Sequence, residues 1–242
     1  MPEIRSLVKA PPVAVTDYRR KFLSEMLGTY LLVLLGAGSV VLAPLVPHLS
    51  AFEQLAVIAL VFGLTVASII IVLGKHSGAH INPAITVASA IAGKLKRELV
   101  FPYVAFQLLG ALLAGLSLDI VFRGLVSSAH LGSTTLGSGI SQMEGVSLEV
   151  AGTFVLAAAA LTAGHFLKRP MAQAALVGGT LFLLIIALGP LTGASFNPAR
   201  SLGPALFSGY LSGQLVYWVG PLVGAGLAGL LFAVLRKGHA ED

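Results

Sequence analysis

The tripeptide Asn-Pro-Ala occurs twice in this chain of 242 residues, at Asn82-Pro83-Ala84 and at Asn197-Pro198-Ala199. Asparagine is a preferred N-cap residue because its side-chain oxygen accepts a hydrogen bond from a free N–H of the first helical turn. Proline is favoured at the next position, where a backbone N–H has no helical partner. Each copy therefore predicts the start of a helix. Both copies lie between apolar stretches, and helices that begin inside a bilayer are typical of channels and transporters.

Two helix starts that face each other can exert an electrostatic effect on whatever lies between them. A helix N-terminus carries about +0.5 of a unit charge. Asn82 and Asn197 would cap their helices with the side-chain oxygen and donate amide N–H groups to a water molecule in the gap. Such a water donates both hydrogens outward and cannot accept one from its neighbours, which predicts exclusion of protons and cations. The alternative is that both asparagines are plain helix caps.

Four further residues could carry chemistry at membrane depth. Arg200 follows the second tripeptide, and because a lone arginine there is costly, it is either functional or half of a structural salt bridge. Glu25 and Glu149 suggest a proton relay, but their matching positions favour a structural role as acceptors for the backbone N–H groups of re-entrant loops. His80 is predicted to pack and hold its loop, since no second His or Cys stands at ligand spacing. No metal site is expected.

The elements that must position these residues are membrane-spanning helices. The chain is 56% hydrophobic and 10% charged, whereas a soluble domain carries about 25% charged residues. Stretches without Asp, Glu, Lys or Arg approach or exceed the ~20 residues that cross the hydrocarbon core; they cover residues 26–46, 55–74, 99–118, 150–167, 171–199 and 202–235. The last two stretches are longer than one span and must contain more than a simple crossing. An integral membrane protein is therefore predicted.

Several classes of protein are not expected. Cysteine is absent, which rules out disulfides and thiolate metal sites, and the polar, basic first twenty residues do not resemble a signal peptide. The sequence contains no nucleotide-binding motif and no nucleophile–base constellation, so we expect neither an enzyme nor a bound cofactor. No residues in the sequence support a purely adhesive membrane protein either.

The basic residues indicate the orientation in the membrane. With six spans, the loops alternate between two sides, and thirteen of the fifteen Lys and Arg residues fall on the side of both termini, leaving Arg123 and Arg200 for the other. The positive-inside rule then places both termini in the cytoplasm. The net charge of +5 is explained by this topology, and no nucleic-acid partner is expected.

Three segments recur in the same order along the chain. Residues 24–30 match 148–154, residues 78–84 match 193–199, and residues 103–115 match 217–229. Because each half then holds three spans, the second half enters the membrane from the opposite face. The predicted divisions are a cytoplasmic segment 1–20, a first repeat 21–120, an extracellular connecting loop 121–147, a second repeat 148–236 and a cytoplasmic tail 237–242.

Each Asn-Pro-Ala copy is predicted to start a re-entrant half-helix. Residues 83–93 make eleven residues, or ~16 Å of helix, which is about half of the ~30 Å hydrocarbon core. Pro204 is expected to shorten or bend the second half-helix. Close helix–helix contacts are predicted at Gly28, Gly110, Gly115, Gly224, Gly226 and Gly229.

On these residues the sequence resembles the aquaporin (major intrinsic protein) family over about residues 20–236. The resemblance is carried by the two Asn-Pro-Ala copies, by Arg200 directly after the second copy, and by the paired Glu25 and Glu149. It implies an all-α membrane protein with six transmembrane helices, two re-entrant half-helices and an inverted three-helix repeat. It also implies a homotetramer of right-handed bundles in which each monomer has its own pore, and a structural role for the two glutamates.

The resemblance also implies which residues line the pore. Counting from the Asn-Pro-Ala copies as in the family, the outer constriction consists of Phe62, Ile185, Ala194 and Arg200. Water-selective members often carry histidine where Ile185 stands, so a wider and more apolar mouth is expected. Residues at other diagnostic positions look like those of water channels, namely Ser201, Ala205, Tyr217 and Trp218, and the constriction most resembles that of archaeal aquaporins. Acceptor carbonyls along the pore are expected from Gly78, Ala79, His80, Gly193, Ala194 and Ser195.

The expected function is a passive water channel that excludes protons and ions and has secondary permeability to glycerol or other small neutral solutes. The expected location is the plasma membrane. One alternative is an aquaglyceroporin-like facilitator of small solutes. A second, from a different class, is an inverted-repeat transporter coupled to an ion, which would need an ionisable pair or a carbonyl cage at the midplane.

Overall fold

The uncharged stretches form six long helices in the computed structural model, which describes residues 15–122 and 127–238. Within these residues the structure contains helices and loops but no strand. The shortest long helix has 23 residues, or ~34 Å at 1.5 Å per residue, which is enough to cross the ~30 Å hydrocarbon core. The six are α1 (Val15–Leu42), α2 (Ala51–Ser77), α4 (Val100–Phe122), α5 (Gln142–Phe166), α6 (Pro170–Thr192) and α8 (Gln214–Gly238).

Two short helices follow the Asn-Pro-Ala copies, α3 (Pro83–Ile91) and α7 (Pro198–Ser208). The first has nine residues, two fewer than predicted, because Gly93 adopts a left-handed conformation with φ of 69°. Pro204 was predicted to shorten or bend α7; the shortening does not occur, since α7 has eleven residues and continues past the proline. Buried contacts with neighbouring helices can support a proline inside a membrane helix, and Pro204 is buried. Short 3₁₀ helices occur at η1 (Ala43–Leu45), η2 (Arg97–Leu99) and η3 (Ser127–Gly132).

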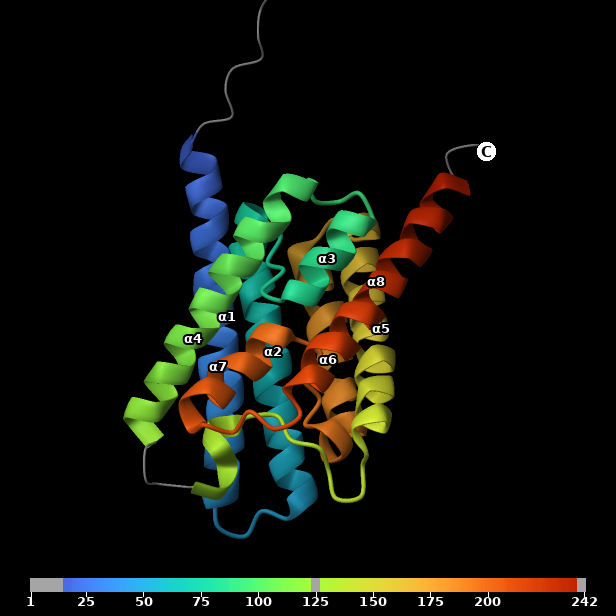
Figure 1. Ribbon diagram of the computed structural model, residues 1–242. Helices are drawn as coiled ribbons and strands as arrows, with labels where there is room; N and C mark the ends of the chain where they lie inside the picture. The colour runs from blue at the N-terminus through green and yellow to red at the C-terminus, as the bar shows by residue number, and fades with distance from the viewer. Residues whose placement is uncertain (1–14, 123–126, 239–242) are drawn as a thin grey trace, which may run out of the picture.

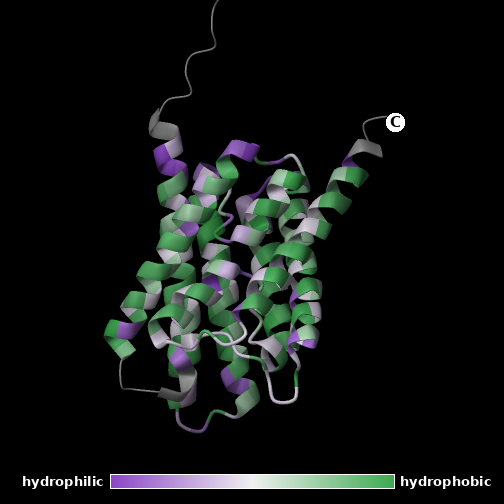
Figure 2. Ribbon diagram, viewed as in Figure 1, coloured by the Kyte–Doolittle hydropathy of each residue, from purple (hydrophilic) through white to green (hydrophobic). Residues whose placement is uncertain are grey.

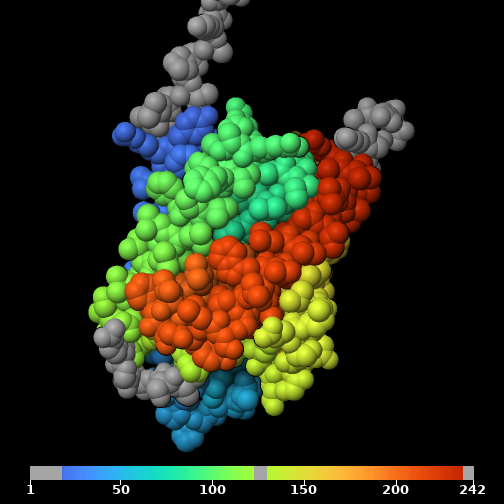
Figure 3. Space-filling model, viewed as in Figure 1, coloured from blue at the N-terminus to red at the C-terminus, as the bar shows by residue number. Residues whose placement is uncertain are grey.

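The long helices pack in pairs around the two short ones. Helix α1 packs against α4, α5 against α8, and α2 against α6, while α3 contacts α8 and α7 contacts α4. Figure 1 shows α3 in the half of the bundle nearest both chain ends and α7 in the opposite half. Viewed from the same side, α7 reaches the surface beside α4 and α8 (Figure 3). The two half-helices therefore enter the bundle from opposite ends.

Most residues of the long helices are hydrophobic between the two ends of the bundle (Figure 2). Large apolar side chains such as those of Phe101 and Leu215 are 81% and 74% exposed, respectively. Monomeric soluble proteins rarely expose contiguous apolar surfaces of this kind, whereas contact with lipid tails requires one. The helix lengths and this surface together indicate a multi-pass membrane protein.

Close helix contacts depend on glycine at matching positions of the two halves. A Cβ on Gly110 would lie 2.2 Å from the carbonyl oxygen of Met26, and one on Gly224 would lie 2.2 Å from that of Val150. Gly115 and Gly229 also meet neighbouring backbone closely, as predicted. Gly28 also marks a helix–helix contact, since a Cβ there would lie 3.1 Å from Ile69 and 3.5 Å from Leu73 on α2, besides 2.6 Å from Ile81 of a loop. The prediction for Gly226 was wrong, because a Cβ there has only Ile91 nearby, at 3.9 Å.

Candidate functional site

The loop before α3 has an unusual backbone that depends on a buried carboxylate. Ala79 and Ile81 have φ values of 50° and 47°, a region that residues with a Cβ rarely adopt. Their neighbourhood is held by Glu25 on α1, which is fully buried and accepts hydrogen bonds from His80 N at 3.0 Å and Ile81 N at 2.6 Å. Ser77 Oγ also donates to Glu25, at 2.6 Å. The carboxylate thus takes up loop N–H groups that have no helical partner.

The loop before α7 repeats this arrangement around Glu149 on α5. Ala194 and Phe196 have φ values of 45° and 52°. Glu149 is likewise fully buried and accepts from Ser195 N at 2.9 Å, Phe196 N at 2.7 Å and Thr192 Oγ1 at 2.8 Å. In both halves a glutamate on a long helix therefore holds a strained loop of another part of the chain.

The first half adds a neutral donor to its glutamate. Gln107 Nε2 on α4 donates to Glu25 at 2.7 Å and to Thr86 Oγ1 at 2.8 Å. Pro221 stands at the matching position of α8, and proline has no side-chain donor. A second side-chain contact, between the loop and its half-helix, occurs in both halves. His80 Nδ1 lies 3.3 Å from Thr86 Oγ1, and at the matching positions Ser195 Oγ lies 2.5 Å from Ser201 Oγ.

Asn82 and Asn197 each cap one half-helix and bind the loop that precedes the other. Their side-chain oxygens accept from Ala84 N at 2.8 Å and Ala199 N at 3.0 Å, which caps α3 and α7. Their amide nitrogens cross the gap in opposite directions: Asn82 Nδ2 donates to Phe196 O at 2.8 Å, and Asn197 Nδ2 donates to Ile81 O at 3.0 Å. An amide NH₂ group has two hydrogens. Each asparagine donates one of them to the opposite loop, which leaves the second for a hydrogen bond to a molecule between the two loops.

Three cavities follow one another through the bundle and share residues where they meet. The central cavity is the smallest, with a volume of ≈ 50 Å³, and both asparagines line it. It shares Phe62 and Arg200 with a cavity of ≈ 220 Å³ at the α7 end. A cavity needs about 10–15 Å³ of such volume per water molecule, so the central one holds only a few. Toward the termini, it shares Ala79, His80 and Ile85 with a cavity of ≈ 240 Å³.

The four residues expected at the constriction lie where the central and outer cavities meet. Phe62 on α2 and Arg200 on α7 line both cavities, Ala194 lines the central one, and Ile185 on α6 lines the outer one. The guanidinium carbon of Arg200 lies 5.2 Å from the centre of the Phe62 ring. The structure therefore brings together four residues from three helices and the loop before α7.

Arg200 is held by backbone. Its Nη1 donates to the carbonyl oxygen of Gly132 at 2.8 Å, and its side chain is 3% exposed. Its Nε has no acceptor among the described residues. Gly132 belongs to the loop that connects the two halves, so this loop positions the arginine. Arg123, the other basic residue assigned to this side, lies outside the described residues.

The residues expected to supply acceptor carbonyls are spread along the path. Ala79, His80, Ala194 and Ser195 line the central cavity, whereas Gly78 lines the cavity near the termini and Gly193 lines the outer one. The left-handed residues described above turn successive peptide groups of each loop, so that N–H groups face the glutamate. The carbonyl oxygens of these peptide groups then point away from the glutamate and can accept hydrogen bonds from molecules in the path.

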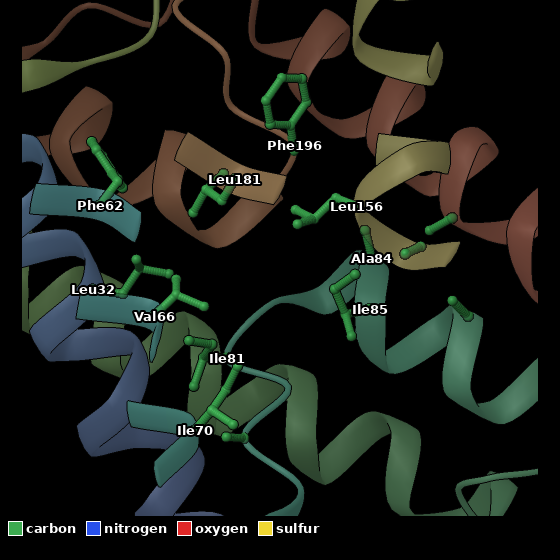
Figure 4. Packing of buried hydrophobic residues seen from close by; sticks show 14 of the residues in the cluster. Leu32, Phe62, Val66, Ile70, Ile81, Ala84, Ile85, Leu156, Leu181 and Phe196 are labelled. Atoms are coloured by element: carbon green, nitrogen blue, oxygen red, sulfur yellow. The ribbon is translucent and has the colours of Figure 1, made fainter. Parts of the chain in front are cut away.

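The apolar walls of the central cavity could not be found by sequence reasoning. Leu32, Val66, Leu156 and Leu181 line it, and Figure 4 shows their side chains directed toward one another from different helices. The same apolar residue types face a pore and face lipid, so nothing in the local sequence distinguishes the two positions.

Sequence reasoning also missed a group of polar residues that lies at the end of the path nearest the chain termini. Lys94 and Gln173 line the cavity there, and Lys94 Nζ lies 2.7 Å from His165 Nδ1. Partial burial, followed by repulsion from Arg236, lowers the pKa of Lys94 below its ordinary value. These residues come from three separate loops or helix ends, and only the fold brings them together.

Comparison with known sequences decides the family. A sequence model described as "Major intrinsic protein" matches residues 13–232. The chain belongs to the major intrinsic protein family. Among curated relatives, aquaporin TIP2-1 of Arabidopsis thaliana is 34% identical over 231 residues, covering 92% of this chain and 89% of that protein. Aquaporin NIP1-1 of Zea mays is 35% identical, with 94% and 78% of the two chains covered.

A solved structure supports the same assignment for this major intrinsic protein. The aquaglyceroporin from Plasmodium falciparum superposes with a TM-score of 0.77 and 26% sequence identity, covering 91% of this chain and 96% of that one. The predicted fold class, six transmembrane helices with two half-helices in an inverted repeat, is therefore confirmed. Members of the family are membrane channels and not enzymes, and this chain is a multi-pass membrane channel.

Proposed function

We propose that the path between the half-helices conducts water passively, excludes protons and ions, and admits some small neutral solutes. The observation that carries this proposal is the chain of three cavities that meet at Phe62 and Arg200 on one side and at the Asn-Pro-Ala loops on the other. Named relatives of this chain are aquaporins, and its structural neighbour is an aquaglyceroporin.

Water passing the centre would accept hydrogen bonds from the free amide hydrogens of Asn82 and Asn197. Both asparagines line the narrowest cavity at the N-termini of α3 and α7. The two helix ends contribute positive potential there, and the water held by its oxygen cannot relay a proton along the file. We propose that these two effects exclude protons and cations.

The solute is selected at the outer constriction. Arg200 supplies donors and positive charge, Phe62 faces it, and Ile185 gives this mouth an apolar side. The apolar side supports the second candidate function, a facilitator of small solutes such as glycerol, because an alkyl wall accommodates the carbon backbone of a polyol. Water and glycerol therefore need to be compared directly.

The test uses purified protein in proteoliposomes and stopped-flow light scattering. Under a sucrose gradient, the vesicles should shrink faster than protein-free vesicles and with a low activation energy. Under a glycerol gradient, the initial shrinkage should be followed by faster re-swelling than in protein-free vesicles. Water flux no faster than that of lipid alone, or flux that saturates and follows an ion gradient, would contradict the proposal.

Replacing Ile185 with His should make the constriction narrower and more polar. Because Ile185 lines the outer cavity next to Phe62 and Arg200, a ring at this position would extend into the path and add a hydrogen-bonding group. Glycerol permeability is expected to fall more than water permeability in the same vesicle assay. The control is Ile185→Leu, which conserves volume and apolarity; an equal change in both variants would show that side-chain polarity is not the cause.

We also propose an orientation, an assembly and a division of the chain. Both described chain ends and the segment between α3 and α4 lie at one end of the bundle (Figure 1). Because this segment contains Lys94 and Arg97, the arrangement supports cytoplasmic termini by the positive-inside rule. The proposed location is the plasma membrane and the proposed assembly a homotetramer, as the family resemblance implies. The matching glutamate–loop contacts support division into repeats at residues 21–120 and 148–236.

A further inference from the structure

The Phe62 ring occupies space that a side chain on α1 would otherwise fill. A Cβ built on Gly36 would lie 2.2 Å from Cε1, 2.4 Å from Cζ and 2.6 Å from Cδ1 of Phe62. Real Cβ atoms do not approach other heavy atoms below 3.0 Å. The edge of the ring therefore rests directly on the α1 backbone, and only glycine at position 36 permits this.

The residues one turn away on α1 bound this seat along the path. Leu32 lines the central cavity and Val40 lines the outer cavity, and the four-residue spacing places both on the same helix face as Gly36. Leu32 and Phe62 belong to one cluster of buried hydrophobic residues, which Figure 4 shows, and Val40 packs against this cluster. The ring thus lies in a slot with glycine as its floor and an apolar side chain at each end.

A ring displaced by a Cβ on Gly36 must move away from the α1 backbone. Phe62 lines both the central and the outer cavity, and the guanidinium carbon of Arg200 lies 5.2 Å from the ring centre. A shift of the ring away from α1 is therefore expected to take it into the path. Interiors are packed too densely to absorb such an overlap without a shift of the side chain.

We propose that Gly36 is a positioning residue that sets the width of the outer constriction, by allowing the Phe62 ring to withdraw into α1. A larger residue at position 36 pushes the ring toward Arg200 and narrows the path. The inference rests on the proposed channel function and adds to it a determinant of permeability that does not itself line any of the three cavities.

The decisive variant is Gly36→Ala, compared with Gly38→Ala as a matched control. Gly38 lies on the same helix and is also buried, but a Cβ there meets only Leu118 at 3.5 Å and Phe122 at 3.9 Å, which are ordinary contacts. In proteoliposomes with equal protein content, Gly36→Ala should lose most of the water permeability and whatever glycerol permeability the wild type shows. Gly38→Ala should retain both.

A double variant separates narrowing of the path from general damage. Phe62→Ala removes the three ring atoms that overlap the new methyl group, Cδ1, Cε1 and Cζ, so Phe62→Ala with Gly36→Ala should conduct like Phe62→Ala alone. Wild-type permeability in Gly36→Ala, an equal loss in Gly38→Ala, or the same fractional loss in the Phe62→Ala background would each overturn the inference.

Reconstitution is itself informative if Gly36→Ala does not yield folded protein. The double variant should then fold and conduct whenever Phe62→Ala does, because the three atoms nearest to the new Cβ all belong to the Phe62 ring; failure of the double variant would overturn the inference. The proposed function fails on a different result, namely wild-type protein that does not accelerate water flux.

Discussion

Replacement of Glu149 with Gln is expected to prevent stable folding, although it changes one oxygen atom to an NH₂ group. The carboxylate accepts three hydrogen bonds, two of them from the backbone N–H groups of Ser195 and Phe196. A Gln amide must turn its NH₂ group toward one of these N–H donors. A buried donor left without an acceptor costs about 1–3 kcal/mol. Both this backbone N–H and the amide NH₂ that faces it would be buried without an acceptor, so we expect a loss of roughly 2–6 kcal/mol.

Thermal unfolding in detergent, followed by circular dichroism and by size-exclusion chromatography of the heated sample, measures this effect. Glu144→Gln is the control on the same helix, since Glu144 is exposed and closes a capping box with Ser141, a role that Gln also performs. Glu144→Gln should unfold like the wild type, and Glu149→Gln should unfold at much lower temperature or fail to yield monodisperse protein. Equal stability of the two variants would mean that the loop does not depend on the buried carboxylate.

Replacement of Asn82 or Asn197 with Asp is expected to retain the helix caps but abolish exclusion of cations. Asp is as good an N-cap as Asn, so α3 and α7 should still form. The negative charge of Asp offsets the positive potential of the helix ends. Asp also lacks the amide NH₂ group, so the hydrogen bond to the opposite loop is lost, which measures 2.8 Å for Asn82 and 3.0 Å for Asn197. Proton or cation leak should therefore rise well above that of the wild type.

A pH-sensitive dye inside the vesicles, with the membrane potential clamped, reports proton flux, and parallel stopped-flow traces report water flux. Ser50→Asp is the matched control, because Ser50 is also an N-cap but lies at the exposed start of α2 and lines none of the three cavities. It should leave the leak at the wild-type level. Unchanged proton and cation exclusion in both asparagine variants would assign exclusion to Arg200 instead.

The parts of the site that follow from local rules could be predicted from the sequence. Asn82 and Asn197 have a position and a neighbouring proline that specify a helix start, and the structure begins α3 and α7 directly after them. The internal repeat then identified Glu25 and Glu149 as a pair. What could not be predicted depends on contacts between distant segments.

Three examples show why. The left-handed conformations of Ala79 and Ile81 oppose the intrinsic preference of both residue types, and they persist because Glu25 holds the loop. Proline alone favours the end of a helix, but α7 continues past Pro204 because this buried proline packs against neighbouring helices. No feature of the sequence distinguishes Gly36 from other small residues of a membrane helix, and only its contact with Phe62, 26 positions away in the chain, gives it a role.

The crossed asparagine bonds have a consequence for biosynthesis. Asn82 Nδ2 reaches a carbonyl 114 residues later, and Asn197 Nδ2 reaches one 116 residues earlier. A nascent chain that has inserted its first three long helices therefore holds a loop whose partner has not yet been made. The centre of the path comes into existence only when the second half docks, so an incompletely synthesised chain carries no finished pore into the membrane.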